Sequence, residues 1–207
     1  GAGARVAVTG RTLSKGEPTA QMVRERGGTA LALACDVKSA TDLAATVAAT
    51  VAEFGGLDIL VNNAQEVPLG KLEDVSDEAF IAGFESGPLA TLRLMKLARP
   101  HLVARGGGTI FNFCSSAGIR WDMTGYGAYG AVKQGIRALT RAAAAEWGGG
   151  GGGSAGDVLT GTFAATATTY PITVGAAGVA SATDVSPAPT AGGNSTALGF
   201  TAVGGGV

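Results

Sequence analysis

The chain has 207 residues and a formal net charge of −1, a length that allows one domain with a substantial core. This near-balanced charge argues against nucleic acid or an anionic membrane surface as a partner. The long uncharged stretch at residues 158–183 contains threonines, glycines and Pro171, which make it too polar for a membrane-spanning helix. We therefore expect a soluble, cytoplasmic protein.

Segments typical of strands and helices alternate along residues 5–147. The short apolar runs predict strands at residues 5–10, 29–37, 57–62 and 109–113. The helical patterns fall at residues 18–26, 39–53, 77–102 and 128–147, and Gly87-Pro88 interrupts the third of these. This alternation predicts an α/β fold with a doubly wound parallel sheet, Rossmann-like, in one domain over residues 1–207. The two cysteines, Cys35 and Cys114, end apolar runs, which favours buried free thiols over a disulfide or metal ligands.

Polar residues follow the predicted strands at their carboxyl ends. They are Arg11, Asp36, the pair Asn62-Asn63, and Ser115. Ligands of doubly wound sheets bind outside the carboxyl ends of the strands. Four such ends predict one cleft that holds a nucleotide.

Tyr129 and Lys133 are four residues apart in the last predicted helix, which places them on one face, one turn from each other. An ammonium at this spacing favours the phenolate form of a neighbouring tyrosine. A serine of the preceding pair, Ser115-Ser116, can hold a substrate oxygen nearby. The spacing alone is also common in solvated helices, so the hypothesis of a proton-transfer site depends on the strand ends around it.

The composition changes sharply after Trp147. All fifteen Lys and Arg residues lie in residues 1–147, and the only charged residues beyond are Asp157 and Asp184. Six consecutive glycines, residues 148–153, open this region. It is interpreted either as a flexible low-complexity segment or as a stretch whose residue identities are unreliable.

Four segments together resemble the short-chain dehydrogenase/reductase family of the single-domain, NAD(P)-dependent type. They are Asp36-Val37, LVNNA at residues 60–64, TIFNFCSSAG at residues 109–118, and Tyr129-xxx-Lys133. They occur in the family's order across about seven tenths of the chain. The resemblance implies a Rossmann-like fold and hydride transfer to or from a nicotinamide cofactor.

The resemblance also implies roles for individual residues. Tyr129 would be the general acid/base, and Lys133 would favour its phenolate and hydrogen-bond the nicotinamide ribose. Ser115 would hold the substrate oxygen, judged by its distance from Asn112 and Gly118. Counting back thirteen residues from Tyr129 points to Ser116 instead, so both serines stay open.

The family's cofactor preference depends on the residue that ends its second strand. An acidic residue there accepts from the ribose 2′-hydroxyl of NAD, whereas an arginine pairs with the 2′-phosphate of NADP. This chain has Gly10 followed by Arg11, which favours NADP(H) over NAD(H). Asp36 and Val37 would frame the adenine, and Asn63 and Ala64 would lie beside the adenosine ribose.

The chain departs from the family pattern in three places. One helix separates Gly10 from Asp36, so Thr9-Gly10 ends the family's second strand, and we expect that the first strand and its glycine-rich loop are missing from this sequence. The helix region at residues 83–87 has no asparagine for a proton relay. Gln65 stands where the family usually has glycine.

We therefore expect an NADP(H)-dependent oxidoreductase that interconverts a carbonyl and a secondary alcohol of a small molecule. The alternatives are a nucleotide-binding relative without catalysis, or an inactive fragment that lacks the pyrophosphate loop. Small residues along the helix at 128–147 favour a homo-oligomer, either a dimer or a tetramer, and we expect neither a metal, nor nucleic acid, nor a membrane as a partner.

Overall fold

The computed structural model describes residues 3–118, 124–147, 172–173, 195–197 and 200–202. The chain divides into two compact units, Gly1–Phe113 and Cys114–Val207. Each unit has its own internal packing. The expectation of a single domain over residues 1–207 stays a prediction.

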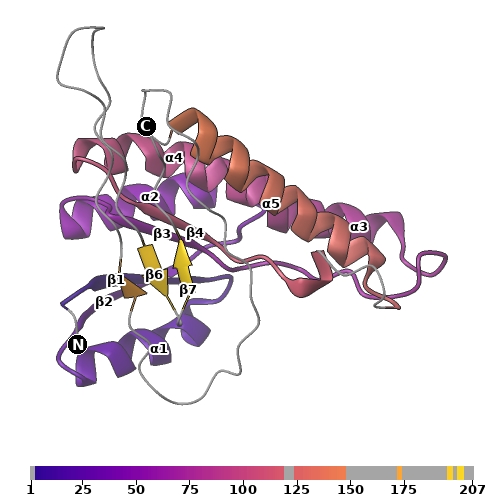
Figure 1. Cartoon of the computed structure of the whole chain (residues 1–207). Helices are drawn as coiled ribbons and strands as arrows, with labels where there is room; N and C mark the ends of the chain where they lie inside the picture. The colour runs from indigo at the N-terminus through magenta and orange to yellow at the C-terminus, as the bar shows by residue number, and fades with distance from the viewer. Residues whose placement is uncertain (1–2, 119–123, 148–171, 174–194, 198–199, 203–207) are drawn as a thin grey trace, which may run out of the picture. The chain divides into compact units, whose positions relative to one another are not determined.

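Strands and helices alternate along the first unit (Figure 1). Its elements are β1 (Arg5–Gly10), α1 (Leu13–Glu25), β2 (Thr29–Ala34), α2 (Ala40–Phe54), β3 (Ile59–Asn62), α3 (Asp77–Phe84), the π-helical segment η1 (Glu85–Leu89), α4 (Ala90–Ala104) and β4 (Thr109–Asn112). All four strands expected before residue 114 are present. Three of them are shorter than expected, and β1 has the expected bounds.

Both strand pairs of this unit are parallel. β1 pairs with β2 from Arg5↔Thr29 to Gly10↔Ala34, and β3 pairs with β4 from Ile59↔Thr109 to Asn62↔Asn112. Parallel neighbours need a long crossover, which α1 supplies for the first pair and the α3–α4 segment for the second. The α/β class and the parallel pairing are confirmed.

The two strand pairs form separate sheets in the described part of the chain. Apolar side chains of β1 and β3 are uncovered: Val6 is 38% exposed, Ile59 47% and Val61 53%. Strands of a parallel α/β sheet are normally buried on both faces. This separation is what we would expect if a strand between β1 and β3 were missing, although the missing strand itself stays a prediction.

Helix α1 begins at Leu13, five residues before the expected start at Pro18. A proline lacks the amide hydrogen that the helix interior uses, which is why the sequence favoured a start there. The first turns instead pack on the neighbouring strand. A Cβ at Gly16 would lie 3.8 Å from Cγ1 of Val8, an ordinary packing distance. Tertiary packing therefore extends this helix past its proline.

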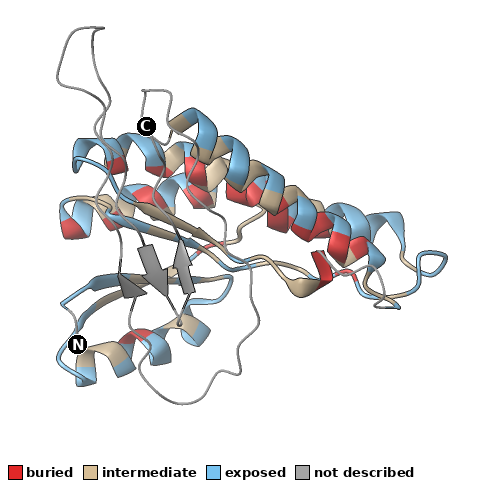
Figure 2. Ribbon diagram, viewed as in Figure 1, coloured by how far each residue is buried: buried red, intermediate tan, exposed pale blue. Residues whose placement is uncertain are grey.

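Helices α2 and α4 pack side by side and form the core of the first unit (Figures 1 and 2). Their buried side chains include Leu43, Val47, Phe54, Met95, Ala98 and Leu102. The Ser39 side chain caps α2 by accepting a hydrogen bond from the Asp42 amide at 3.2 Å. Gly55 ends the helix in the left-handed conformation, with φ of 76°.

The expected interruption at Gly87-Pro88 is a π-helical segment between α3 and α4. Proline removes one helical hydrogen bond, and the wider π turn accommodates this loss. Ser86, which is only 2% exposed, donates its hydroxyl to the Ala82 carbonyl at 2.7 Å. This segment is therefore buried and well bonded.

The second unit contains the 3-10 turn η2 (Ser116–Gly118), α5 (Gly127–Trp147), β5 (Ile172–Thr173), β6 (Ser195–Ala197) and β7 (Phe200–Ala202). The three short strands form an antiparallel sheet within the segment that the sequence predicts as low-complexity. The described part of the chain has no helix with the length and apolarity that crossing a bilayer requires.

Substitution Gly108→Ala tests the close approach that starts β4. The added Cβ would lie 2.6 Å from the Asp58 carbonyl oxygen and 2.6 Å from Cδ2 of Leu102. We expect the free energy of unfolding, measured in urea, to fall by about 1–3 kcal/mol. Gly10→Ala is the matched control, since a Cβ added there would have no heavy atom within 4 Å. Equal stability of both variants would contradict the packing at Gly108.

Candidate active site and nucleotide-binding residues

Parallel pairing brings polar residues to the carboxyl end of each strand pair. The Cys35 amide donates to the Gly10 carbonyl at 2.9 Å, which extends the β1–β2 ladder to the point where Arg11 and Asp36 begin. In the second pair, Nδ2 of Asn62 donates to Oδ1 of Asn112 at 2.7 Å. The strand-end residues of each pair therefore lie at one edge, as the sequence predicts.

Asp36 organises the turn between β2 and α2. Its Oδ1 accepts from the Lys38 amide at 3.0 Å, and its own amide donates to Oδ2 of Asp42 at 2.9 Å. That backbone hydrogen bond, followed by one from Ser39, lowers the pKa of Asp42 below its usual range. The turn is consequently held to the first turn of α2.

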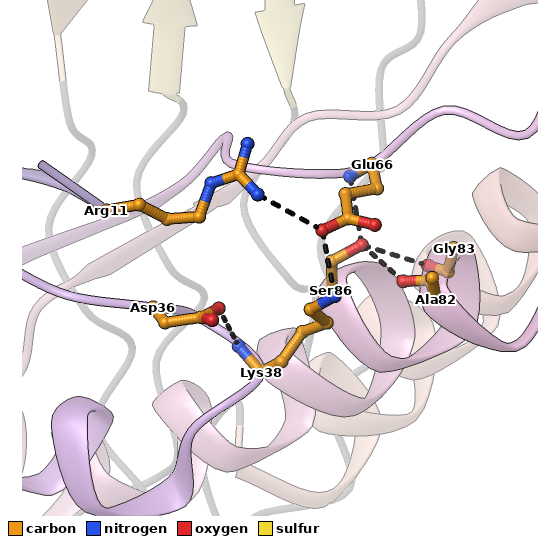
Figure 3. Close-up of polar contacts among 7 residues, drawn as sticks. All are labelled: Arg11, Asp36, Lys38, Glu66, Ala82, Gly83 and Ser86. Carbon is orange, nitrogen blue, oxygen red and sulfur yellow. Dashed lines mark hydrogen bonds and ion pairs between the residues drawn. The ribbon is translucent and has the colours of Figure 1, made fainter. Parts of the chain in front are cut away.

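Three charged side chains meet beside this turn (Figure 3). Oε1 of Glu66 lies 2.9 Å from Nζ of Lys38 and 3.5 Å from Nη1 of Arg11. The hydrogen bond with Glu66 is the largest cause of the raised pKa of Lys38, against an opposing effect of desolvation. Sequence reasoning missed Lys38 and Glu66. The proximity of Lys38 to Asp36, two residues away, is the signal that could have found the lysine.

The segment after β3 contains the remaining residues expected near the cofactor. Asn63 and Ala64 are exposed, and Val37 at the β2 end is half-buried. Both polar atoms of the Gln65 amide are buried and have no hydrogen-bond partner in the described part of the chain. An unpaired buried amide costs about 1–3 kcal/mol, so this position suits a polar ligand group.

Tyr129 and Lys133 lie one turn apart on α5, as predicted. Nζ of Lys133 is 5.6 Å from the centroid of the Tyr129 ring. Lys133 is only 5% exposed, and this burial lowers the pKa of its ammonium, while Cys114 opposes the shift. The Lys133 ammonium therefore lies beside the Tyr129 ring, and a role of the pair in proton transfer stays a prediction.

The loop of Ser115 packs directly on α5. A Cβ at Gly130 would lie 2.7 Å from the Ala117 carbonyl oxygen, and one at Gly118 would lie 3.0 Å from Cβ of Lys133. Glycines at these positions let the two backbones approach closely. The hydroxyl of Ser115 accepts from the Ala117 amide at 3.2 Å. This contact leaves the choice between Ser115 and Ser116 open, since both are half-buried.

The two cysteines differ in environment. Cys35 is buried, as expected, whereas Cys114 is only partly buried. Burial raises the pKa of the Cys114 thiol, while the nearby Lys133 and Arg137 charges oppose this effect. Neither thiol is thereby favoured as a nucleophile at neutral pH.

The expected site residues thus form two groups, one in each unit. Arg11 and Asp36 lie with Lys38 and Glu66 in the first unit, and the Ser115 loop lies with Lys133 in the second. That all of them converge on one cleft stays a prediction.

Gly130→Ala tests the contact between the Ser115 loop and α5. In an ordinary exposed helix this change raises stability by about 1 kcal/mol. Here we expect a lower melting temperature, because the new methyl group would overlap the Ala117 carbonyl. Gln134→Ala, at an exposed position of the same helix, is the control and should leave the melting temperature nearly unchanged. A stabilised Gly130→Ala variant would contradict the close approach.

Comparison with known proteins identifies the family. The family model described as "short chain dehydrogenase" matches residues 1–169. A second model, described as "Glycine-rich domain", matches residues 138–207. The second match agrees with the glycine-rich composition of the C-terminal segment.

Relatives are found among both curated proteins and solved structures. A 12alpha-hydroxysteroid dehydrogenase of a Clostridium species is 37% identical over 151 residues, which cover 70% of this chain and 58% of the relative. A gluconate 5-dehydrogenase from Burkholderia cenocepacia, solved with NADP and tartrate, is 27% identical with a TM-score of 0.65, covering 70% of this chain and 56% of the other. An NAD⁺-bound xylitol dehydrogenase is 28% identical with a TM-score of 0.65, covering 69% and 55%.

The chain spans somewhat over half the length of the curated relatives that it matches. The solved relatives share its arrangement of strands and helices, which supports the Rossmann-like α/β class. The matching family model covers most of the chain and includes all the segments that carry the site residues. This chain belongs to the short-chain dehydrogenase family.

Proposed function

We propose that the whole protein is an oxidoreductase that interconverts a carbonyl and a secondary alcohol with NADP(H). The observation that carries this proposal is Lys133, buried one helical turn from Tyr129 and packed beside the Ser115 loop. A protein that only binds nucleotide has no need of a buried ammonium next to a phenol. The relatives' names refer to a hydroxysteroid, to gluconate and to xylitol, which leaves the substrate of this protein undefined.

Each catalytic residue has a proposed role in moving one proton. In the reducing direction, the Tyr129 hydroxyl donates its proton to the substrate oxygen as the carbonyl becomes an alcohol. The Ser115 hydroxyl donates a hydrogen bond to the same oxygen, and Ser116 is the alternative. Lys133 stabilises the phenolate that remains and hydrogen-bonds the nicotinamide ribose. When bound, the cofactor supplies the hydride.

NADP(H) is the proposed cofactor because of the charges at the end of β1. Gly10 offers no carboxylate there, and two cations, Arg11 and Lys38, lie close by. The carboxylate of Glu66 between them is an internal anion, so this position is suited to a phosphate. Solved relatives hold NADP in one case and NAD⁺ in another, which keeps NAD(H) as the alternative. The proposal also keeps Asp36 with Val37 at the adenine, and Asn63 with Ala64 at the ribose.

A further strand belongs to the proposed active form. The uncovered valines of β1 and β3 and the separation of the two sheets favour a parallel strand between them. We propose that this strand ends in the glycine-rich turn that binds the cofactor pyrophosphate. Without such a turn the chain would be an inactive fragment. That outcome is the main competing function, beside a nucleotide binder without catalysis.

The proposed enzyme is a cytoplasmic homo-oligomer, either a dimer or a tetramer. Alanines at residues 131, 138, 142 and 145 are exposed on α5 and recur at heptad-like spacing. Small side chains of this kind allow a second helix to approach closely. The proposed substrate is a small carbonyl compound or alcohol.

Tyr129→Phe tests the acid/base role. We expect turnover to fall by about 10²–10⁴-fold, because the substrate oxygen loses its proton donor. The dissociation constant for NADPH, measured by fluorescence titration, should change less than about twofold. Tyr126→Phe is the matched control, since its ring centroid lies 6.3 Å from that of Tyr129, and it should keep most of the turnover. Equal loss of nucleotide binding in Tyr129→Phe would reject the assignment.

Arg11→Ala tests the cofactor preference. We expect NADPH affinity to weaken by roughly three- to tenfold, a modest factor because Arg11 is 70% exposed and water screens its ion pairs. NADH affinity should stay nearly unchanged. Arg26→Ala removes the same charge at an exposed position beyond α1 and serves as the control. A parallel loss of NADH affinity would mean that Arg11 does not pair with the 2′-phosphate.

A further inference from the structure

Glu66 is a negatively charged residue inside a positively charged site. Its carboxylate is shared by Lys38 at 2.9 Å and Arg11 at 3.5 Å, and all three side chains remain partly exposed. Figure 3 shows the carboxylate between the two cations. An anion that binds to this pair of cations must therefore compete with a carboxylate that the protein itself provides.

The backbone contacts around these residues keep the arrangement in place. The Lys38 amide donates to Asp36, and the Lys38 carbonyl accepts from Nη1 of Arg93 at 3.1 Å. The Glu66 amide donates to the buried hydroxyl of Ser86 at 2.9 Å (Figure 3). The main chain is held at both ends of the Lys38–Glu66 ion pair. The Glu66 side chain, which is 36% exposed, is the part that can turn away.

We propose that Glu66 is a specificity-determining residue that occupies the position of the cofactor 2′-phosphate in the ligand-free protein. Binding of that phosphate requires the carboxylate to leave Lys38 and Arg11, because two neighbouring anions repel each other. Glu66 therefore weakens the binding of nucleotides with a 2′-phosphate. Nucleotides without this phosphate do not displace the Glu66 carboxylate, so Glu66 does not weaken their binding. This inference rests on the proposed NADP(H) site.

Substitution Glu66→Gln separates the charge from the shape of the side chain. The probes are 2′,5′-ADP, which carries the phosphate, and 5′-AMP, which lacks it, with binding to the whole protein measured by calorimetry. We expect the variant to bind 2′,5′-ADP about three- to tenfold more tightly, as the loss of partly exposed ion pairs allows. Affinity for 5′-AMP should change less than about twofold. Neither measurement depends on catalysis.

A control and a second variant make the result specific. Glu53→Gln removes one charge near the other end of α2, roughly 20 Å along the helix, and should leave both affinities unchanged. In a Lys38→Gln background, Glu66→Gln should increase the affinity for 2′,5′-ADP by a smaller factor. The reason is that the carboxylate and the phosphate no longer compete for Lys38 in that background. An equal effect in both backgrounds would overturn the role of Lys38.

The remaining outcomes are distinguishable. Unchanged binding of 2′,5′-ADP by Glu66→Gln would overturn this inference and leave the proposed function standing. Weaker binding of 5′-AMP would overturn it in another way, by indicating that Glu66 accepts from a ribose hydroxyl. If the unmodified whole protein, with the further strand proposed above, bound neither probe, the NADP(H) site itself would be rejected, and this inference with it.

Discussion

Parallel pairing of strands is the constraint on which the proposed nucleotide-binding residues depend. Because β1 and β2 run in the same direction, the residues after Gly10 and Ala34 emerge at one edge. Arg11 and Asp36 therefore both follow strands that end at this edge, although they are distant in sequence. The pairing of β3 with β4 does the same for Asn62 and Asn112, whose side chains are hydrogen-bonded. The helices contribute in two ways. They form the crossover that each pair of parallel strands needs, and they cover one face of the strand pair.

In the second unit, close backbone packing is what brings the expected site residues together. Gly118 and Gly130 let the turn after Ser115 lie against α5, which brings that loop beside Lys133. Burial there lowers the pKa of the Lys133 ammonium, which makes its charge harder to maintain. The proposed proton transfer depends on this close packing, because a side chain at either glycine would push the loop away from the helix.

The charged cluster of the first unit consists of Arg11, Lys38 and Glu66. A site for a doubly charged phosphate needs cations close together, and those cations repel each other when no ligand is bound. The Glu66 carboxylate relieves this repulsion between Arg11 and Lys38. The Glu66 backbone amide is held by the hydroxyl of Ser86 on the η1 segment. In the proposed NADP(H) site, affinity for the phosphate and stability of the ligand-free protein are therefore opposed at Glu66. The interruption at Gly87-Pro88 thereby acquires a role, since it belongs to the segment that positions Glu66.

The sequence by itself determined the α/β class, the order of strands and helices, and the Tyr129–Lys133 spacing, since local periodicity and fixed helical geometry decide these features. It also predicted the strand-end residues Arg11 and Asp36. Tertiary structure alone decided the rest. The start of α1 before Pro18 depends on packing against β1, and the ion pairs of Glu66 join residues 28 and 55 positions apart. Such contacts have no periodic signature, because they depend on how elements distant in the sequence pack, and only the folded chain brings those charges within reach of one another.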